Sequence, residues 1–350
     1  MNRFLPDTLI KKIKVHTAYS IPVLLATIIL VLSMAQTGMA QSILPSLGDD
    51  RSGTAGFQFS KINVDPRSAA MGGSSIATAT DPSSLYWNPA LASQIEGTQL
   101  MASHTAYFVD ISMEYLSYVQ KLGPLTVGAS VQYLNSGEME ETTEFEQFGT
   151  GRTFRTIHYT AGLTASQRLT DLFSYGITLR YFKERIEEVD ISTAAVDLGF
   201  YYKVGDTGLR MAVGLNNFGF DANPSGSTIR TTLQGPVEAT SFDNVSLPTR
   251  FNLGVAYDVI ESENYNLLVT SQITNPSDNS ERFSMGGELT FMDQFFLRTG
   301  YSFGQEELDI PSIGAGFEIP YAGRALKIDY GFTNFERLGN LHRFGLIVKL

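Results

Sequence analysis

The stretch LKIDYGF (residues 326–332) decides the fold, because apolar and polar or small side chains alternate along it without interruption. Apolar residues occupy every second position from Leu326 to Phe332, and Lys327, Asp329 and Gly331 lie between them. Successive side chains of a β-strand point to opposite faces, so a two-residue period predicts a strand with one apolar and one polar face. The same pattern recurs from about residue 98 to the last residue of the chain.

Strand length separates the two architectures that such strands can build, a soluble sandwich and a membrane barrel. Most of the alternating segments run for about ten residues or more, as tilted membrane strands do, whereas strands of soluble proteins average about five or six. Their minor face is rich in glycine with scattered charges, which suits a crowded barrel interior. The sequence therefore predicts an all-β fold, a transmembrane antiparallel β-barrel of about 14 strands that contacts outer-membrane lipid.

The expected connections alternate in length, and this alternation indicates the orientation of the barrel. Short turns are expected at 121–124, 169–171, 205–208, 261–264, 292–294 and 321–324. Longer joins are expected at 136–152, 219–247, 275–281, 304–309 and 334–341. Outer-membrane barrels have short periplasmic turns and longer outer loops, so both ends of the barrel chain are expected on the periplasmic side.

The chain stops on an alternating strand, HRFGLIVKL (342–350). Its apolar face carries Phe344, Leu346, Val348 and Leu350. A terminal strand of this kind is what barrel-assembly machinery recognises, so we interpret these four residues as an assembly signal.

The N-terminus predicts export from the cytoplasm. Positive charges between Arg3 and Lys14 precede an uncharged apolar run at 21–35, and Gly38 and Ala40 supply the small residues that a signal peptidase reads. Residues 1–40 are therefore predicted to be a cleaved secretory signal peptide. A single membrane anchor is the alternative, although the run is short for a span of about 20 residues.

Composition bounds the chemistry that this chain can perform. It carries 25 Lys and Arg against 36 Asp and Glu, a net charge of −11, and no cysteine. The acidity argues against nucleic-acid partners, and the lack of thiols excludes a disulfide framework. His104, His158 and His342 have no second ligand at metal-binding spacing, and we find no nucleophile–base motif. The sequence predicts no enzymatic activity, no metal and no cofactor.

The stretch DPSSLYWNPA (81–90) holds the only tryptophan of the chain, Trp87, between two prolines. Pro82 and Pro89 exclude a central strand or a helix interior, yet the aromatic residues between them need burial. Residues 41–97 precede the predicted barrel (98–350), and barrel lumens are commonly plugged by their own chain. We therefore interpret 41–97 as an N-terminal plug, or hatch, in which Trp87 is buried and Asn88 bonds to backbone groups. A periplasmic segment folded beside the barrel is the alternative.

The block VDPRSAAMGGSSIATATDPSSLYWNPALAS (64–93) resembles the N-terminal signature of the PorV/PorQ family, relatives of FadL-type barrels that carry an Asn-Pro-Ala motif in a luminal hatch. The motif residues are Asp65, Arg67, Met71, Gly72, Gly73, Asp81, Pro82, Tyr86, Trp87, Asn88, Pro89 and Ala90. Weaker likeness continues through 133–151, 179–188, 197–219, 247–257 and 340–350. The resemblance implies a FadL-like barrel with a hatch and a place in type IX secretion. There such a protein receives cargo C-terminal domains from the translocon barrel and passes them to the attachment machinery.

Three functions remain open: a carrier component of type IX secretion, a FadL-like channel for small hydrophobic molecules, and a structural barrel. A channel needs an apolar pocket behind the hatch, whereas a carrier needs a docking surface on its outer face. The loop at 136–152 is the candidate surface, because it interleaves acids with aromatic residues; a solvated loop without a partner is the alternative. The candidate residues are Glu138, Glu140, Glu141, Phe145 and Phe148.

Charged residues on the minor face of the strands are interpreted as ion pairs that fix the hatch and hold the lumen open, with a ligand set as the alternative. They are Arg180, Asp197, Arg210, Glu288, Arg298, Glu318, Lys327, Asp329 and Arg343.

Overall fold

The computed structural model describes residues 53–350 apart from 144–145, 233–234, 305–307, 309 and 322–323. The predicted signal peptide, the first residues of the predicted hatch and Phe145 lie outside the described residues.

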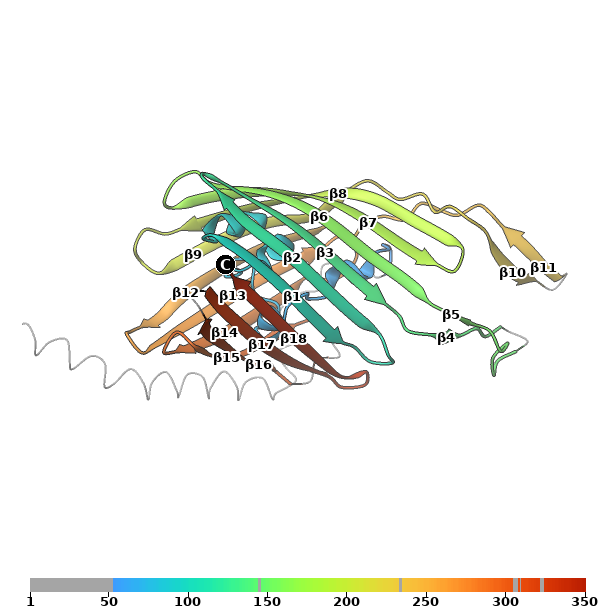
Figure 1. The fold of residues 1–350 in the computed structure, drawn as a ribbon. Helices are drawn as coiled ribbons and strands as arrows, with labels where there is room; N and C mark the ends of the chain where they lie inside the picture. Colours follow the sequence, from blue (N-terminus) through green and yellow to red (C-terminus); the bar gives the residue numbers. More distant parts are fainter. Residues whose placement is uncertain (1–52, 144–145, 233–234, 305–307, 309, 322–323) are drawn as a thin grey trace, which may run out of the picture. The chain divides into compact units, whose positions relative to one another are not determined.

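In the described part of the chain, 14 antiparallel strands close into a barrel, as the sequence predicts (Figure 1). They are β1 (Thr98–Ala106), β2 (Ser112–Leu122), β3 (Leu125–Asn135), β6 (Thr156–Arg168), β7 (Phe173–Ile186), β8 (Val189–Lys203), β9 (Leu209–Gly219), β12 (Arg250–Glu261), β13 (Tyr265–Pro276), β14 (Arg282–Phe291), β15 (Phe295–Phe303), β16 (Ser312–Tyr321), β17 (Arg324–Phe335) and β18 (Gly339–Lys349). Each strand pairs with its neighbour in the chain, and β1 also pairs with β18, so the sheet has no free edge. Closure gives each barrel strand a hydrogen-bonded neighbour on both sides, which is the condition for a sheet to cross a lipid bilayer.

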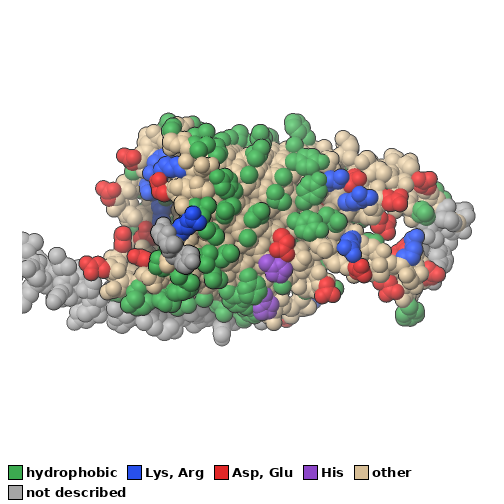
Figure 2. All heavy atoms as spheres, in the orientation of Figure 1, with side chains coloured by type: hydrophobic (Ala, Val, Ile, Leu, Met, Phe, Trp, Pro, Cys, Tyr) green, Lys and Arg blue, Asp and Glu red, His purple; other side chains and the backbone are tan. Residues whose placement is uncertain are grey.

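The wall has its polar face inside and its apolar face outside, as a barrel in lipid requires. Along β17, Lys327 and Asp329 are buried toward the lumen, whereas Ile328 between them is 48% exposed. Figure 2 shows the result on one face of the molecule: apolar side chains cover the middle, and charged side chains gather toward both ends.

The six predicted short turns lie between consecutive strands that pair at one end of the barrel, which we call the short-turn end. The chain enters β1 and leaves β18 at this same end, where Leu350 N–H donates to the Thr98 carbonyl at 2.9 Å. Exposed aromatic side chains flank these turns, as in the girdles that mark a membrane interface. They include Tyr175, Tyr202, Tyr257, Tyr265, Phe291 and Phe295.

The opposite end, which we call the long-loop end, departs from the predicted strict alternation. The join expected at 334–341 is a tight turn, because β17 and β18 stay paired up to Phe335 and Gly339. β7 and β8 are likewise joined by only Glu187 and Glu188, and Glu187 takes a left-handed φ of 52° that lets the two strands reverse.

Two joins at the long-loop end form hairpins of their own. β4 (Met139–Glu140) pairs with β5 (Thr153–Phe154), and β10 (Thr228–Thr232) pairs with β11 (Gly235–Ala239). Figure 1 shows both hairpins reaching past the ends of the barrel strands.

The residues before β1 fold as short turns of helix inside the barrel (Figure 1), and we call residues 53–97 the hatch. Its elements are η3 (Gln58–Lys61), α2 (Pro66–Ala70), α3 (Ser84–Trp87) and η4 (Pro89–Gln94). Pro66 opens α2 after the capping residue Asp65, and Pro89 opens η4 after the capping residue Asn88. A proline is favourable at this first position, because an N–H would have no partner there. Among the described helices, none has the length and apolarity that a membrane crossing demands.

Candidate functional site

The hatch lies directly on the glycine-bearing inner face of the wall. An ideal Cβ at Gly300 of β15 would stand 2.1 Å from the Met71 carbonyl carbon, and one at Gly176 of β7 would stand 2.5 Å from the Pro89 carbonyl carbon. Side chains at these wall positions would therefore exclude the hatch backbone. The glycines of the minor face make room for the hatch.

Asn88 of the Asn-Pro-Ala motif bonds to three backbone groups, as the sequence predicts. Its Oδ1 accepts from Ala90 N–H at 3.0 Å, and its Nδ2 donates to the Ile76 carbonyl at 3.0 Å and to the Phe200 carbonyl of β8 at 3.2 Å. One buried amide thus caps η4, ties two parts of the hatch together and joins the hatch to the wall.

Trp87 is buried, with 6% of its surface exposed, and its indole N–H donates to Asp65 Oδ1 at 2.8 Å. The other oxygen of Asp65 caps α2 by accepting from Ser68 N–H at 2.7 Å. Burial and the nearby charge of Asp81 raise the pKa of the Asp65 carboxyl, and the two hydrogen bonds oppose that rise. Asp81 itself accepts from Ser83 N–H at 2.9 Å, which orders the turn containing Pro82.

Arg67 forms the strongest polar link between hatch and wall. Its Nε and Nη2 donate to the two carboxylate oxygens of Glu288 on β14 at 2.8 and 2.9 Å. Glu288 also accepts from Arg298 Nε at 2.5 Å, and Arg298 Nη1 donates to Asp329 at 2.6 Å. Two cations and two carboxylates therefore alternate across the hatch, β14, β15 and β17, and we call them the Glu288 network. Paired charges of this kind are stable in a buried site only because each has its partner.

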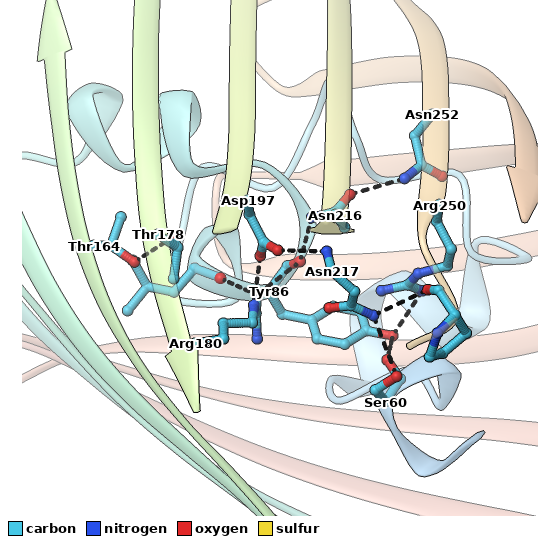
Figure 3. Close-up of polar contacts among 12 residues, drawn as sticks. Ser60, Tyr86, Thr164, Thr178, Arg180, Asp197, Asn216, Asn217, Arg250 and Asn252 are labelled. Atoms are coloured by element: carbon cyan, nitrogen blue, oxygen red, sulfur yellow. Dashed lines mark hydrogen bonds and ion pairs between the residues drawn. The ribbon is translucent and has the colours of Figure 1, made fainter. Parts of the chain in front are cut away.

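A second link surrounds Tyr86 (Figure 3). Arg180 of β7 pairs with Asp197 of β8 and donates to the Leu85 carbonyl at 2.7 Å. The Tyr86 hydroxyl donates to the Ser60 carbonyl at 3.1 Å and accepts from Arg250 Nη1 at 3.1 Å. The guanidinium carbons of Arg180 and Arg250 stand 5.9 and 5.2 Å from the centre of its ring.

Most of the predicted luminal charges thus fix the hatch as ion pairs or line the lumen beside it. Two of them do not: Arg210 pairs with Asp258 at 2.6 Å, and Glu318 pairs with Lys349 at 2.7 Å. Both of these pairs are partly exposed near the short-turn end, where the hatch does not reach them.

Beside the hatch, toward the long-loop end, lies a cavity of about 580 Å³. On the hatch side its lining includes Lys61, Gly72, Gly73 and Trp87. On the wall side the lining includes Arg250, Arg282 and Arg343. The sequence predicts a luminal position for Arg343 but not for Arg250 or Arg282. Arg250 and Arg282 are the first residues of their strands, where a two-residue period is hardest to read. Arg250 and Arg282 lie two positions before Asn252 and Ser284, which face the lumen, so the two-residue period could have placed both arginines on the luminal face.

Two glutamates of the predicted docking loop form ion pairs with nearby arginines. Glu141 accepts from Arg152 Nε at 2.5 Å and Nη2 at 2.6 Å, and Glu138 accepts from Arg155 at 2.9 Å. Charge pairing within the β4–β5 hairpin replaces the mutual repulsion expected of a solvated acidic run. Phe148 at its tip is 99% exposed.

Comparisons with known structures agree with the barrel fold. The chain is similar to the toluene transporter TbuX of Ralstonia pickettii (11% identity, TM-score 0.57, covering 82% of this chain and 98% of that one). It is similar to the toluene transporter TodX of Pseudomonas putida (15% identity, TM-score 0.55, 82% and 97% covered) and to a FadL homologue of Pseudomonas aeruginosa (12% identity, TM-score 0.50, 81% and 97% covered). At these identities the likeness concerns the fold alone.

Curated proteins gave no match by sequence. A sequence model described as type IX secretion system protein PorV matches residues 46–276, more than half of the 350-residue chain. The matched region contains the whole hatch and nine strands of the described barrel, β1 to β13 without the four short hairpin strands. The chain therefore belongs to the PorV family, the outer-membrane β-barrel components of type IX secretion.

Proposed function

We propose that this protein is a carrier of type IX secretion that binds the C-terminal domains of secreted cargo at its long-loop end. In this role it receives cargo from the translocon barrel and passes it to the surface-attachment machinery. The observation that carries the proposal is the pair of hairpins β4–β5 and β10–β11, which extend this end beyond the barrel (Figure 1).

These extensions carry apolar side chains that touch little of their own chain. Phe148 is 99% exposed, Ile229 is 70% exposed and Val237 is 52% exposed. They stand beyond the strands that would contact lipid, so membrane burial does not account for them. Exposed aromatic residues that become buried on association supply much of the binding energy at protein interfaces.

The ion pairs of the β4–β5 hairpin favour the same role. A loop held by Glu141–Arg152 and Glu138–Arg155 loses less conformational freedom on binding than an unpaired acidic loop. The remaining acids of the loop, including Glu140, would act mainly on encounter rate and salt dependence.

A FadL-like channel for small hydrophobic molecules is the alternative, since toluene transporters share the fold. The cavity beside the hatch argues against it. Arginines, hydroxyls and amides dominate the lining. The apolar part of the lining is smaller and consists of Ile62, Ala69, Trp87, Pro276, Leu308 and Phe335. A hydrophobic solute would have to displace water from these polar groups without replacing their hydrogen bonds.

The orientation required by the carrier role predicts a labelling pattern. We expect a cysteine at Thr142 in the β4–β5 hairpin to react in intact cells with a maleimide that does not cross the outer membrane. A cysteine at Asp206, in the exposed β8–β9 turn, should react only after the outer membrane is opened. The chain has no cysteine of its own, so any label on this protein reports the introduced residue. The reverse pattern would contradict the orientation and with it the carrier proposal.

Shortening the β4–β5 hairpin tests cargo binding directly. Glu141 and Thr150 face each other across it, with Thr150 N–H donating to the Glu141 carbonyl at 2.8 Å, so residues 142–149 can be replaced by the two-residue turn Asn-Gly. We expect this variant to assemble normally but to lose co-purification with a purified cargo C-terminal domain from the same organism. The expected loss is at least tenfold in affinity, because Phe148 leaves with the turn.

Val109→Ser is the matched control for this experiment. Val109 lies in the β1–β2 loop at the same end and is 84% exposed, but it stands outside both hairpins. Cargo binding that survives the hairpin replacement, combined with altered uptake of toluene by an Asn88→Ala variant, would favour the channel. Unchanged binding and unchanged uptake would leave a structural barrel.

A further inference from the structure

Three arginines from separate strands converge on the cavity beside the hatch. Arg250 opens β12, Arg282 opens β14 and Arg343 lies near the start of β18, and all three line the same 580 Å³ space. Arg250 is only 6% exposed and Arg343 only 4% exposed, so water compensates little of their charge.

The other buried arginines of the lumen each have a carboxylate partner. Arg67 and Arg298 share Glu288, and Arg180 pairs with Asp197. By contrast, no carboxylate of the described residues lies within ion-pair distance of Arg250, Arg282 or Arg343. The cavity arginines therefore present positive charge that the described part of the protein leaves uncompensated.

The hydrogen bonds of these arginines leave donors free. Arg250 Nη1 donates to the Tyr86 hydroxyl and Arg343 Nη1 to the Thr333 hydroxyl, both at 3.1 Å, and both acceptors are neutral. The buried Nε of Arg250 and the buried Nε of Arg343 have no partner among the described residues. Unmet donors on buried cations are costly, and an oxoanion is the group that satisfies several of them at once.

Lys61 also lines the cavity, and its ammonium group pairs with Asp278 at 2.9 Å. Burial lowers the pKa of the Lys61 ammonium, the hydrogen bond and charge of Asp278 oppose this change, and the positive charges of Arg282 and Arg250 add to it. Lys61 on the hatch and the three arginines of the wall line the same cavity.

Much of the uncharged part of the lining is hydrophilic. Asn252, Gln272, Ser284, Ser302 and Ser312 contribute amides and hydroxyls, the groups that bind water or the hydroxyls of a solute. The volume falls in the range of small-molecule sites, about 300–1,000 Å³. The arginines face the lumen rather than the lipid-covered side of the wall, so a water-soluble ligand suits the site.

We propose that this cavity binds a small hydrophilic anion, a hydroxylated solute that carries a carboxylate or phosphate group, through Arg250, Arg282 and Arg343. Planar guanidinium groups match both oxoanions with paired N–H donors. The site is separate from the hairpins proposed to bind cargo, so its presence or absence leaves the carrier proposal unaffected.

The test is titration of the purified full barrel in detergent with sodium phosphate and with sodium glucuronate, at constant ionic strength. Calorimetry measures the affinity, and Trp87 reports the location, because it is the only tryptophan and it lines the cavity. We expect saturable heat with at least one of the two anions and a parallel change in Trp87 emission. Arg282→Gln should weaken binding about tenfold, since it removes one charge-assisted contact.

Two variants keep the result interpretable. Arg210→Gln removes an arginine that pairs with Asp258 outside the cavity, and it should bind both anions as the wild type does. Arg282→Lys keeps the charge without the planar fork and should bind between the wild type and Arg282→Gln. Saturation by phosphate alone or glucuronate alone supports the proposal and names the oxoanion. Absence of saturable binding for both, or equal binding by Arg282→Gln and the wild type, would overturn it.

Discussion

Gly286→Val is expected to expel the hatch and convert a closed barrel into an ion-conducting pore. An ideal Cβ at Gly286 would lie 2.5 Å from the Met71 carbonyl oxygen and 2.7 Å from Ser74 Oγ. Backbone cannot yield at such distances, so either the hatch moves or strand β14 does. β14 is held on both sides by its pairing with β13 and β15, whereas the hatch is held at separate points. The overlap involves backbone and cannot be relieved by a rotamer change, so its cost should exceed the usual overpacking cost of about 1–3 kcal/mol and should fall on the hatch.

Conductance across a planar lipid bilayer measures this result. An empty barrel of 14 strands is wider than the eight-stranded barrels whose side chains fill the lumen, so loss of the hatch should admit hydrated ions. Trp87 emission should shift to the red at the same time, because the indole would meet water.

Gly287→Val is the matched control for this variant. Gly287 is the next residue of the same strand and points away from the hatch, with the Leu268 carbonyl at 3.7 Å as the one atom near an added Cβ. This variant has the same change in volume and β-propensity, and it should stay closed with unchanged Trp87 emission. Equal conductance in the two variants would mean that the hatch does not seal the lumen.

Glu288→Gln is expected to destabilise hatch docking by about 3–5 kcal/mol, the cost of leaving buried charge without its partner. The amide keeps the shape of the side chain, but Arg67 loses its carboxylate and Arg298 retains only Asp329. Urea titration of the protein in lipid vesicles gives the measurement. Trp87 emission reports release of the hatch, and circular dichroism reports the barrel separately, so the loss should appear in the Trp87 transition.

Glu318→Gln tests whether the effect belongs to burial rather than to any lost ion pair. Glu318 also lies on a barrel strand, but its partner Lys349 is 40% exposed, and exposed pairs contribute about 0–1 kcal/mol. The Trp87 transition of this variant should match the wild type. A comparable loss in both variants would show that the Glu288 network is not the element that holds the hatch.

The sequence predicts the barrel well because lipid requires an apolar outer face on every strand. The polar residues Lys327 and Asp329 alternate with apolar ones and so mark the face toward the lumen. Glycines on that same face indicate that another segment, here the hatch, lies close to the wall. The hatch is predictable for a related reason: Tyr86 and Trp87 need burial, and two prolines exclude the sheet as the place for it. These inferences depend on residues that are close together in the chain.

What the sequence does not predict depends on residues that are far apart. Arg67 and Glu288 are separated by 221 positions, and no local pattern pairs them. The tight β7–β8 turn depends on a left-handed conformation at Glu187, which a glutamate only sometimes adopts. Arg250 and Arg282 of the cavity escape notice because each opens its strand, where a two-residue period is hardest to read.

The position of the hatch also constrains the order in which the molecule can be made. The hatch leads directly into β1, whose register with β18 closes the barrel, so the seam lies beside the point where the hatch leaves the lumen. We expect the hatch to dock before β1 and β18 pair, because the open sheet gives it direct access to the inner face of the wall. The segment that precedes β1 would then lie against an open sheet until β18, the last strand, pairs with β1. Contacts between residues far apart in the chain form slowly, because a long loop must be closed first. The pairing of β1 with β18 is such a contact, and it also encloses the hatch in the lumen.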